Sequence, residues 1–433
     1  MPEVAALPLA VSVVLFVGTV IGALLRANHR TTIAFGGAIL AIVLGTWLEF
    51  YTAHSILTAV NFDAVTLLLG MMILAGLAGR TGLLQAVAIR AAKAARGRLW
   101  LLFLLFCFTA LLASMVFDNV STVVLLVPVF VSIADVLDRS PVPFLFAGIV
   151  FANLGGAATL IGSTTNILIG TAAGLSFASV FAHLAPLVCA IGIVGAGVFL
   201  ATHPSIWRSG KASAASLRAL DTRRALEDPR QARILAAVIA GTLLLLFLHN
   251  VLRLPAGPIA LFGALVGVLA VKADVDTTLK AVRWDILLFL IALYIIVGAL
   301  GASGMFDVLG NALASFADHN VLLAVVVVLW TALFGSGLLG GVPFIMAAVP
   351  VFVGWIPTVG PLSVLWWSLA IGAALGENLT PRSVSALAIA PLARSLGTHL
   401  AFRPWIHRVG PVCLVSALLA TGALLYVTQC FIP

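Results

Sequence analysis

The chain alternates long apolar runs with short polar connections, and this pattern predicts a bundle of membrane-spanning helices. About 20 apolar residues in a helix are enough to cross the hydrocarbon core of a bilayer. Runs of this kind lie near residues 5–25, 33–50, 62–79, 143–171, 178–201, 234–252, 255–271, 284–301, 363–393 and 410–430. We expect the first to be a membrane span rather than a signal peptide, because neither a basic leading segment nor a small-residue cleavage site accompanies it.

Two further apolar stretches, 99–137 and 321–353, are too long for one span and contain only a short kink near the middle. Each predicts a re-entrant helical hairpin that enters and leaves the membrane on one side. Runs 143–171 and 363–393 carry glycine, proline and polar residues at mid-span, which predicts two broken helices. The expected fold class is an all-α polytopic membrane protein with about ten transmembrane helices, two re-entrant hairpins and two broken helices.

Composition excludes a soluble protein. Of the 433 residues, 62% are hydrophobic and 9% are charged, whereas soluble domains are about half apolar and a quarter charged. The net charge of +8 comes from basic residues in a few connections rather than a stripe, so we predict no nucleic-acid partner. The four cysteines show no CxxC spacing, and we predict no disulfide framework, metal site or cofactor.

The basic connections predict the topology, because positively charged loops stay on the cytoplasmic side. If the two long stretches are hairpins, all the basic connections fall on one side and both termini face outward, in a multi-pass protein of the cell (inner) membrane. The connection 202–233 is the most soluble-looking segment and divides the chain. It predicts a cytoplasmic linker between two halves, 1–201 and 234–433.

An internal repeat relates the halves at an offset of 222 residues. The matched pairs include Asp63 with Asp285, Ser114 with Ser336 and Pro128 with Pro350; at offset 221 they include Gly155 with Gly376 and Thr159 with Thr380. Five spans and one hairpin in each half reverse the second half relative to the first. Inverted repeats with broken helices indicate a secondary transporter whose substrate binds near the midplane.

The first hairpin turns at a polar cluster, Asp118, Asn119, Ser121 and Thr122, with apolar residues on both sides. Polar and ionisable groups at membrane depth are costly unless they line a polar cavity, so we expect a substrate or ion site here rather than a solvated turn. The first broken helix adds Gly162, Ser163, Thr164 and Asn166, whose half-helix ends would offer free N–H and C=O groups. Close helix packing would explain Gly155 and Gly156 but not this polar run.

The second hairpin turns at Gly340 and Gly341, without an Asp-Asn pair. Polar groups lie instead in the second broken helix, at Glu377, Asn378, Thr380 and Arg382. Glu377 and Arg382 could pair with each other; otherwise Glu377 is a coupling carboxylate or Arg382 meets an anion. The proton-coupling candidates are therefore Asp118 and Glu377.

Asp63 and Asp285 occupy equivalent positions at the start of two spans, beside Phe62 and Trp284. Interfacial placement and capping of a helix N-terminus explain an aspartate there without a transport role.

The runs NFDAVTLLLGMMILAGLAGRTG, FDNVSTVVLLVPV and NLGGAATLIGSTTNILIG resemble the ion transporter superfamily, in the branch of arsenite permeases, D-type sodium/proton antiporters and the melanosomal P protein. Members often carry Asp-Asn at both hairpin tips, whereas Gly340 and Gly341 stand at the second tip here. The second break, LGENLTPRSVSA, is similar to the LG...TP run of arsenite permeases. The resemblance implies arsenite as substrate and, because members are often dimers, a homodimer.

Three hypotheses of transport follow. The leading one is proton-coupled efflux of arsenite or antimonite by alternating access, with the neutral trihydroxide held by hydroxyl and amide groups. A sodium/proton antiporter and a sodium- or proton-coupled organic-anion transporter are the alternatives. An enzyme is disfavoured because no HExxH, GxSxG or paired intramembrane aspartates occur, and a channel needs no inverted pair of broken helices.

Overall fold

The computed structural model describes residues 6–26, 29–204, 206, 228–309, 320–359 and 363–431. These residues form helices and connections, as the hydropathy pattern predicts. The first half contains α1 (Ala6–Leu25), α2 (Arg30–Trp47), α3 (Ala53–Ala59), α4 (Phe62–Arg80), α5 (Leu83–Ala94), α6 (Leu99–Val116), α7 (Asn119–Val136), α8 (Val142–Gly156), α9 (Thr164–Ala173) and α10 (Phe177–Thr202). The second contains α13 (Pro229–Leu252), α14 (Ala256–Ala270), α15 (Val275–Ala281), α16 (Trp284–Ala302), α18 (Val321–Leu339), α19 (Gly341–Val359), α20 (Ser363–Glu377), α21 (Val384–Ala388), α22 (Ala390–Ser395) and α23 (Phe402–Phe431).

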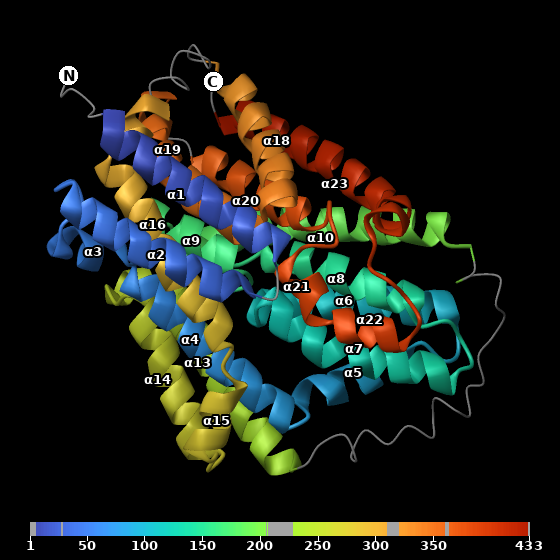
Figure 1. Ribbon diagram of the computed structural model, residues 1–433. Coiled ribbons are helices and arrows are strands. Elements are labelled where there is room, and N and C mark those ends of the chain that lie inside the picture. The colour runs from blue at the N-terminus through green and yellow to red at the C-terminus, as the bar shows by residue number, and fades with distance from the viewer. Residues whose placement is uncertain are drawn as a thin grey trace.

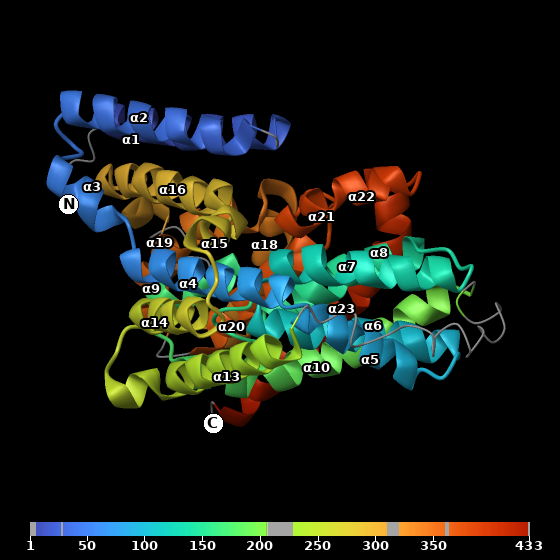
Figure 2. The same ribbon diagram turned by 90° about the horizontal axis from the view of Figure 1, so that it is seen from below.

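Ten of the described helices are long and apolar enough to cross a membrane, and α8, α14 and α19 are shorter apolar helices. This confirms the all-helical polytopic fold class. The short helices α3, α5 and α15, which the pattern of apolar runs did not predict, lie between longer ones, and α22 begins within the predicted run 363–393. Figures 1 and 2 place α3 at one end of the molecule and α5 and α22 at the other.

Both predicted hairpins have their kink where the polar or glycine residues stand. Helix α6 ends at Val116 and α7 begins at Asn119, so the first turn is two residues long. Helix α18 ends at Leu339 and α19 begins at Gly341, and Gly340 between them has φ +87°, a conformation that glycine adopts without strain. The broken helices are likewise interrupted as expected, between α8 and α9 and between α20 and α21.

Helix packing repeats the sequence symmetry. Helix α6 packs on α8 in the first half, and α18 packs on α20 in the second. A Cβ on Gly155 of α8 would lie 2.2 Å from the carbonyl oxygen of Leu111, and a Cβ on Gly376 of α20 would lie 2.3 Å from that of Leu333. Both glycines are therefore required for close backbone approach, the use of small residues typical of membrane helix packing. These contacts fix each broken helix against the first arm of its own hairpin.

Helices also pack across the two halves, α4 on the shorter helix α14 and α2 on α16. Figure 2 shows α1 and α2 along one flank of the molecule and α13 along the opposite flank. Since α10 packs on α23 as well, the hairpins and broken helices are surrounded by long helices of both halves.

Candidate functional site

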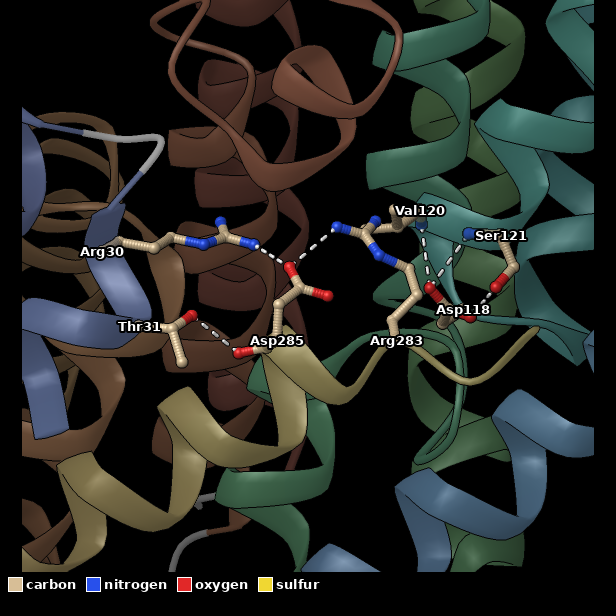
Figure 3. A network of polar contacts seen from close by, with 7 residues as sticks. All are labelled: Arg30, Thr31, Asp118, Val120, Ser121, Arg283 and Asp285. Carbon is tan, nitrogen blue, oxygen red and sulfur yellow. Dashed lines mark hydrogen bonds and ion pairs between the residues drawn. The ribbon is translucent and has the colours of Figure 1, made fainter. Parts of the chain in front are cut away.

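The Asp118 carboxylate caps its own helix. It is buried, and one of its oxygens accepts hydrogen bonds from the backbone N–H groups of Val120, at 3.1 Å, and Ser121, at 3.0 Å. The Ser121 hydroxyl donates to the other oxygen, as Figure 3 shows. A helix N-terminus carries orphan donors and partial positive charge, and both stabilise a carboxylate there. Asp118 is thus committed to the first turn of α7.

Asn119 and Glu377 bring the first hairpin tip and the second broken helix together. The Asn119 amide donates to the Glu377 carboxylate at 3.0 Å, across 258 residues of sequence, and both side chains are buried. The same amide nitrogen donates to the side-chain oxygen of Asn153 at 3.0 Å, and the Asn119 backbone N–H donates to the Gly162 backbone carbonyl at 3.0 Å. The tip is therefore bound to both breaks.

Glu377 also lies against the second hairpin tip. A Cβ added to Gly341 would lie 2.1 Å from the nearer Glu377 carboxylate oxygen. The glycine thus provides the space that this carboxylate occupies. Glu377, the last residue of α20, stands between the two tips, with Asn119 on one side and Gly341 on the other.

Asn153 of α8 joins the two broken helices, and sequence reasoning missed its role. Its amide donates to the Asn378 side-chain oxygen at 2.9 Å, and its own oxygen accepts from the Ser385 hydroxyl at 2.6 Å. The Trp405 indole donates to the Asn378 backbone carbonyl at 2.8 Å. A buried asparagine within an apolar span was the available signal, but its partners in the second broken helix, Asn378 and Ser385, are 225 and 232 residues away.

The first break is satisfied mainly from within. Ser163 caps α9, and the Asn166 amide donates to the carbonyls of Gly156, Ala157 and Thr159 at 2.8–3.3 Å. The Asn166 side-chain oxygen is buried and has no hydrogen-bond partner among the described residues. The same is true of the Thr122 hydroxyl. Both residues were predicted to belong to the site, and both present an unsatisfied oxygen.

A cavity of about 580 Å³ opens beside the hairpin tips. The predicted site residues that line it are Asn119, Thr164, Gly340, Gly341, Glu377, Thr380 and Arg382. The other predicted residues do not line it: Asp118, Ser121, Thr122, Gly162, Ser163, Asn166 and Asn378.

Arg382 is exposed in this cavity and forms no ion pair with Glu377 or with any other residue that the structure describes. Of the alternatives left open by the sequence, the Glu377–Arg382 pair is therefore not formed. Arg30 also lines the cavity, but its guanidinium is paired with Asp285 at 3.0 Å.

The expected helix-capping role of Asp63 and Asp285 is wrong. Asn61 caps α4, and no side chain caps α16. Asp63 instead accepts from the backbone N–H of Gly257, at the start of α14, at 2.8 Å. Asp285 is held by Arg30 and by Arg283, at 3.0 and 3.2 Å (Figure 3).

These two aspartates form equivalent contacts between the two halves of the chain. Each lies in the first turn of its own helix and binds the N-terminal part of a helix from the other half, so sequence symmetry reappears as contact symmetry. Because Arg30 lines the cavity, the ion pair between Arg30 and Asp285 lies at the edge of the cavity.

Comparison with known proteins identifies transporters. Residues 13–372 match the family model CitMHS, described as citrate transporter. An uncharacterized transporter of Mycobacterium tuberculosis is 32% identical over 419 residues, covering 95% of this chain and 96% of that protein. The human P protein is 27% identical over 470 residues, which cover 90% of this chain and 56% of the P protein.

Among solved structures, the YdaH transporter of Alcanivorax borkumensis, described as having an unusual topology, is similar with a TM-score of 0.58. The alignment covers 86% of each chain at 16% sequence identity, so the likeness concerns the fold. The sequence-based resemblance to relatives of the P protein is confirmed, as is the expectation of a multi-pass membrane transporter.

Proposed function

We propose that this chain, which belongs to the CitMHS citrate transporter family of membrane transporters, is a secondary active transporter that works by alternating access. Its substrate binds in the 580 Å³ cavity beside the hairpin tips. Paired breaks at which half-helix ends meet are the usual position of a transporter substrate site. The observation that carries the proposal is the position of Glu377, which touches the tips of both hairpins.

Glu377 is the proposed carrier of the coupling proton, in preference to Asp118. The Asp118 carboxylate is satisfied by three donors of its own helix end, whereas Glu377 receives one side-chain hydrogen bond, from Asn119. An unpaired carboxylate at membrane depth is costly, and protonation removes that cost. Because Glu377 contacts both tips, a change in its charge would alter the contacts of both hairpins at once.

A small organic anion, of the carboxylate class that citrate represents, is the substrate that the cavity favours. Arg382 presents to it a guanidinium that pairs with no carboxylate in the described part of the chain, and guanidinium groups bind carboxylates with two parallel hydrogen bonds. An anion bound beside Glu377 would favour the protonated carboxyl, because two adjacent negative charges repel each other. Substrate and proton would then move in the same direction.

Arsenite is the second candidate, and the neutral polar groups in the lining of the cavity support it. Asn119, Thr164 and Thr380 offer amide and hydroxyl groups that suit a neutral trihydroxide without a counter-ion. On this alternative a protonated Glu377 would not be needed to bind the substrate, and arsenite efflux would be exchanged for an incoming proton. The Arg382 charge would then have no role in affinity.

Sodium is the alternative coupling ion. The unsatisfied buried oxygens of Thr122 and Asn166 lie on α7 and α9, at the first hairpin and the first break. Oxygens at such breaks are the groups that coordinate sodium in secondary transporters.

The test is transport in proteoliposomes with radiolabelled citrate or arsenite, under imposed pH or sodium gradients. We expect citrate uptake driven by a pH gradient, abolished by Glu377→Gln and weakened more than tenfold in affinity by Arg382→Gln. Arg253→Gln, at the end of α13 away from the cavity lining, is the matched control. Arsenite movement that is insensitive to Arg382→Gln would identify the second candidate instead. Failure of every gradient to move either solute would refute the proposal.

Membrane orientation and assembly are proposed from the sequence. The basic connections place the α5 end of the molecule in the cytoplasm and the α3 end outside, in the inner membrane with both termini extracytoplasmic. A homodimer is proposed from the superfamily resemblance, and crosslinking in native membranes would test it.

A further inference from the structure

A second cavity, of about 490 Å³, lies between the short helix α3 with α16 and the pair α9 and α19. None of the described residues that line it is charged. Its polar residues are Tyr51, Ser55, Thr58, Asn61 and Tyr294, and the rest of the lining is apolar. It differs in this respect from the first cavity, which contains Arg30, Glu377 and Arg382.

Tyr51 gives this second cavity an unused donor. Its side chain is 1% exposed, and its hydroxyl has no hydrogen-bond partner among the residues that the structure describes. The hydroxyl lies against Gly298. A Cβ added to Gly298 would lie 2.5 Å from the Tyr51 hydroxyl oxygen and 2.6 Å from the Cβ of Ala59. A buried polar group is costly when it is left unpaired, so this hydroxyl indicates an oxygen acceptor from outside the chain.

The two cavities lie on successive turns of the same three helices. On α9 they are lined by Thr164 and then by Leu168 and Ala172; on α16 by Phe289 and then by Tyr294. On α19 the first cavity ends at Pro343 and the second begins at Ile345. Because a helix has 3.6 residues per turn and rises 1.5 Å per residue, these steps of two to five residues separate the cavities by about half a turn to one and a half turns.

The barrier between them is thin and apolar. Val342, on the first-cavity side, is 7% exposed, and Ile345, on the second, is fully buried. Both belong to the first turns of α19, the helix whose N-terminus contacts Glu377. Movement of this hairpin tip would therefore alter the barrier directly.

We infer that the second cavity is a further binding site for the transported solute, where the Tyr51 hydroxyl donates to a solute oxygen on the side of α3. This inference rests on the proposed function. A chargeless lining would hold an anion only weakly, which suits release, whereas the Arg382 charge suits capture at the first cavity.

Two variants test the second cavity. Tyr51→Phe removes only the hydroxyl, and we expect its transport rate to fall about tenfold, equivalent to the loss of about one hydrogen bond, while citrate-induced thermal stabilisation through the first cavity is unchanged. Thr58→Cys, in a background with the exposed Cys430 replaced by serine, should react with a membrane-impermeant maleimide, lose transport when labelled, and be protected by citrate. Leu57→Cys is the matched control, because Leu57 is 67% exposed on the same helix and does not line the cavity.

The outcomes separate the two proposals. A wild-type protein that moves no solute refutes the proposed function, and the solute site with it. A wild-type protein that transports, together with Tyr51→Phe and labelled Thr58→Cys variants that transport equally well, refutes the second cavity alone. Equal loss of transport on labelling Leu57→Cys and Thr58→Cys would also overturn it, because the effect would then be a property of α3 as a whole.

Discussion

Gly341→Ala should impair transport without unfolding the protein. The new Cβ would lie 2.1 Å from a Glu377 carboxylate oxygen and 2.9 Å from the Thr165 methyl carbon. Because the closest atom is the end of a flexible side chain, Glu377 would swing away by about 1 Å or more to restore van der Waals contact. The hydrogen bond from Asn119, now 3.0 Å, would then be broken.

A hydrogen bond to a charged group contributes about 1.5–3 kcal/mol. At about 1.4 kcal/mol per factor of ten, its loss corresponds to a fall of about 10- to 150-fold in kcat/KM for transport. Global stability should change little, because the displaced group is a single side-chain end beside a cavity.

The assay is initial-rate uptake in proteoliposomes over a range of external pH, with thermal unfolding in detergent measured in parallel. Gly197→Ala in α10 is the matched control, because no atom lies within 4 Å of its added Cβ. Adding Glu377→Asp to Gly341→Ala withdraws the carboxylate by one methylene and should restore part of the rate. A Gly341→Ala protein with wild-type rates and an unchanged pH profile would refute the role assigned to the contact.

Three other substitutions probe the surroundings of the site. Asn153→Leu should lower the free energy of unfolding by about 2–3 kcal/mol, because it leaves buried polar partners unpaired. Denaturant titration in detergent measures this free energy, and a loss below about 0.5 kcal/mol, the usual effect of a surface substitution, would contradict the prediction. Trp405→Phe should lower the free energy of unfolding by about 1–3 kcal/mol, because it removes the donor to the Asn378 backbone carbonyl. Thermal unfolding measures this, and an unchanged transition temperature would contradict it. Asp285→Asn should change stability by no more than about 1 kcal/mol, because the pair with Arg30 is partly exposed, and the difference from wild type should shrink at high salt.

The hairpin kinks and the breaks could be predicted because their causes are local. Asp118 caps the start of α7 with its own side chain, and Gly340 adopts a positive φ, so each interruption follows from residues at the turn itself. The structure ends and restarts the helices at these residues.

The roles of individual polar residues were predicted less well. Asp118 was expected to be a substrate or coupling group, and the structure shows its carboxylate capping α7. Asp63 was expected to cap its own helix and instead binds the start of α14. The Asp118 carboxylate found its donors within its own helix turn, whereas the Asp63 carboxylate found its donor 194 residues away, and the composition of the two segments does not distinguish these outcomes.

The sequence by itself determined that this protein lies in a membrane, that it is built of helices and where the hairpins and broken helices are interrupted, because hydropathy and helix breaking act over neighbouring residues. Only the tertiary structure decided that Glu377 meets Asn119 and Gly341, that it leaves Arg382 unpaired, and that Tyr51 faces a second cavity. These contacts join residues that are far apart in the chain. They depend on how close two helices come, and a glycine such as Gly155 or Gly376 sets that distance only once its partner helix is in place.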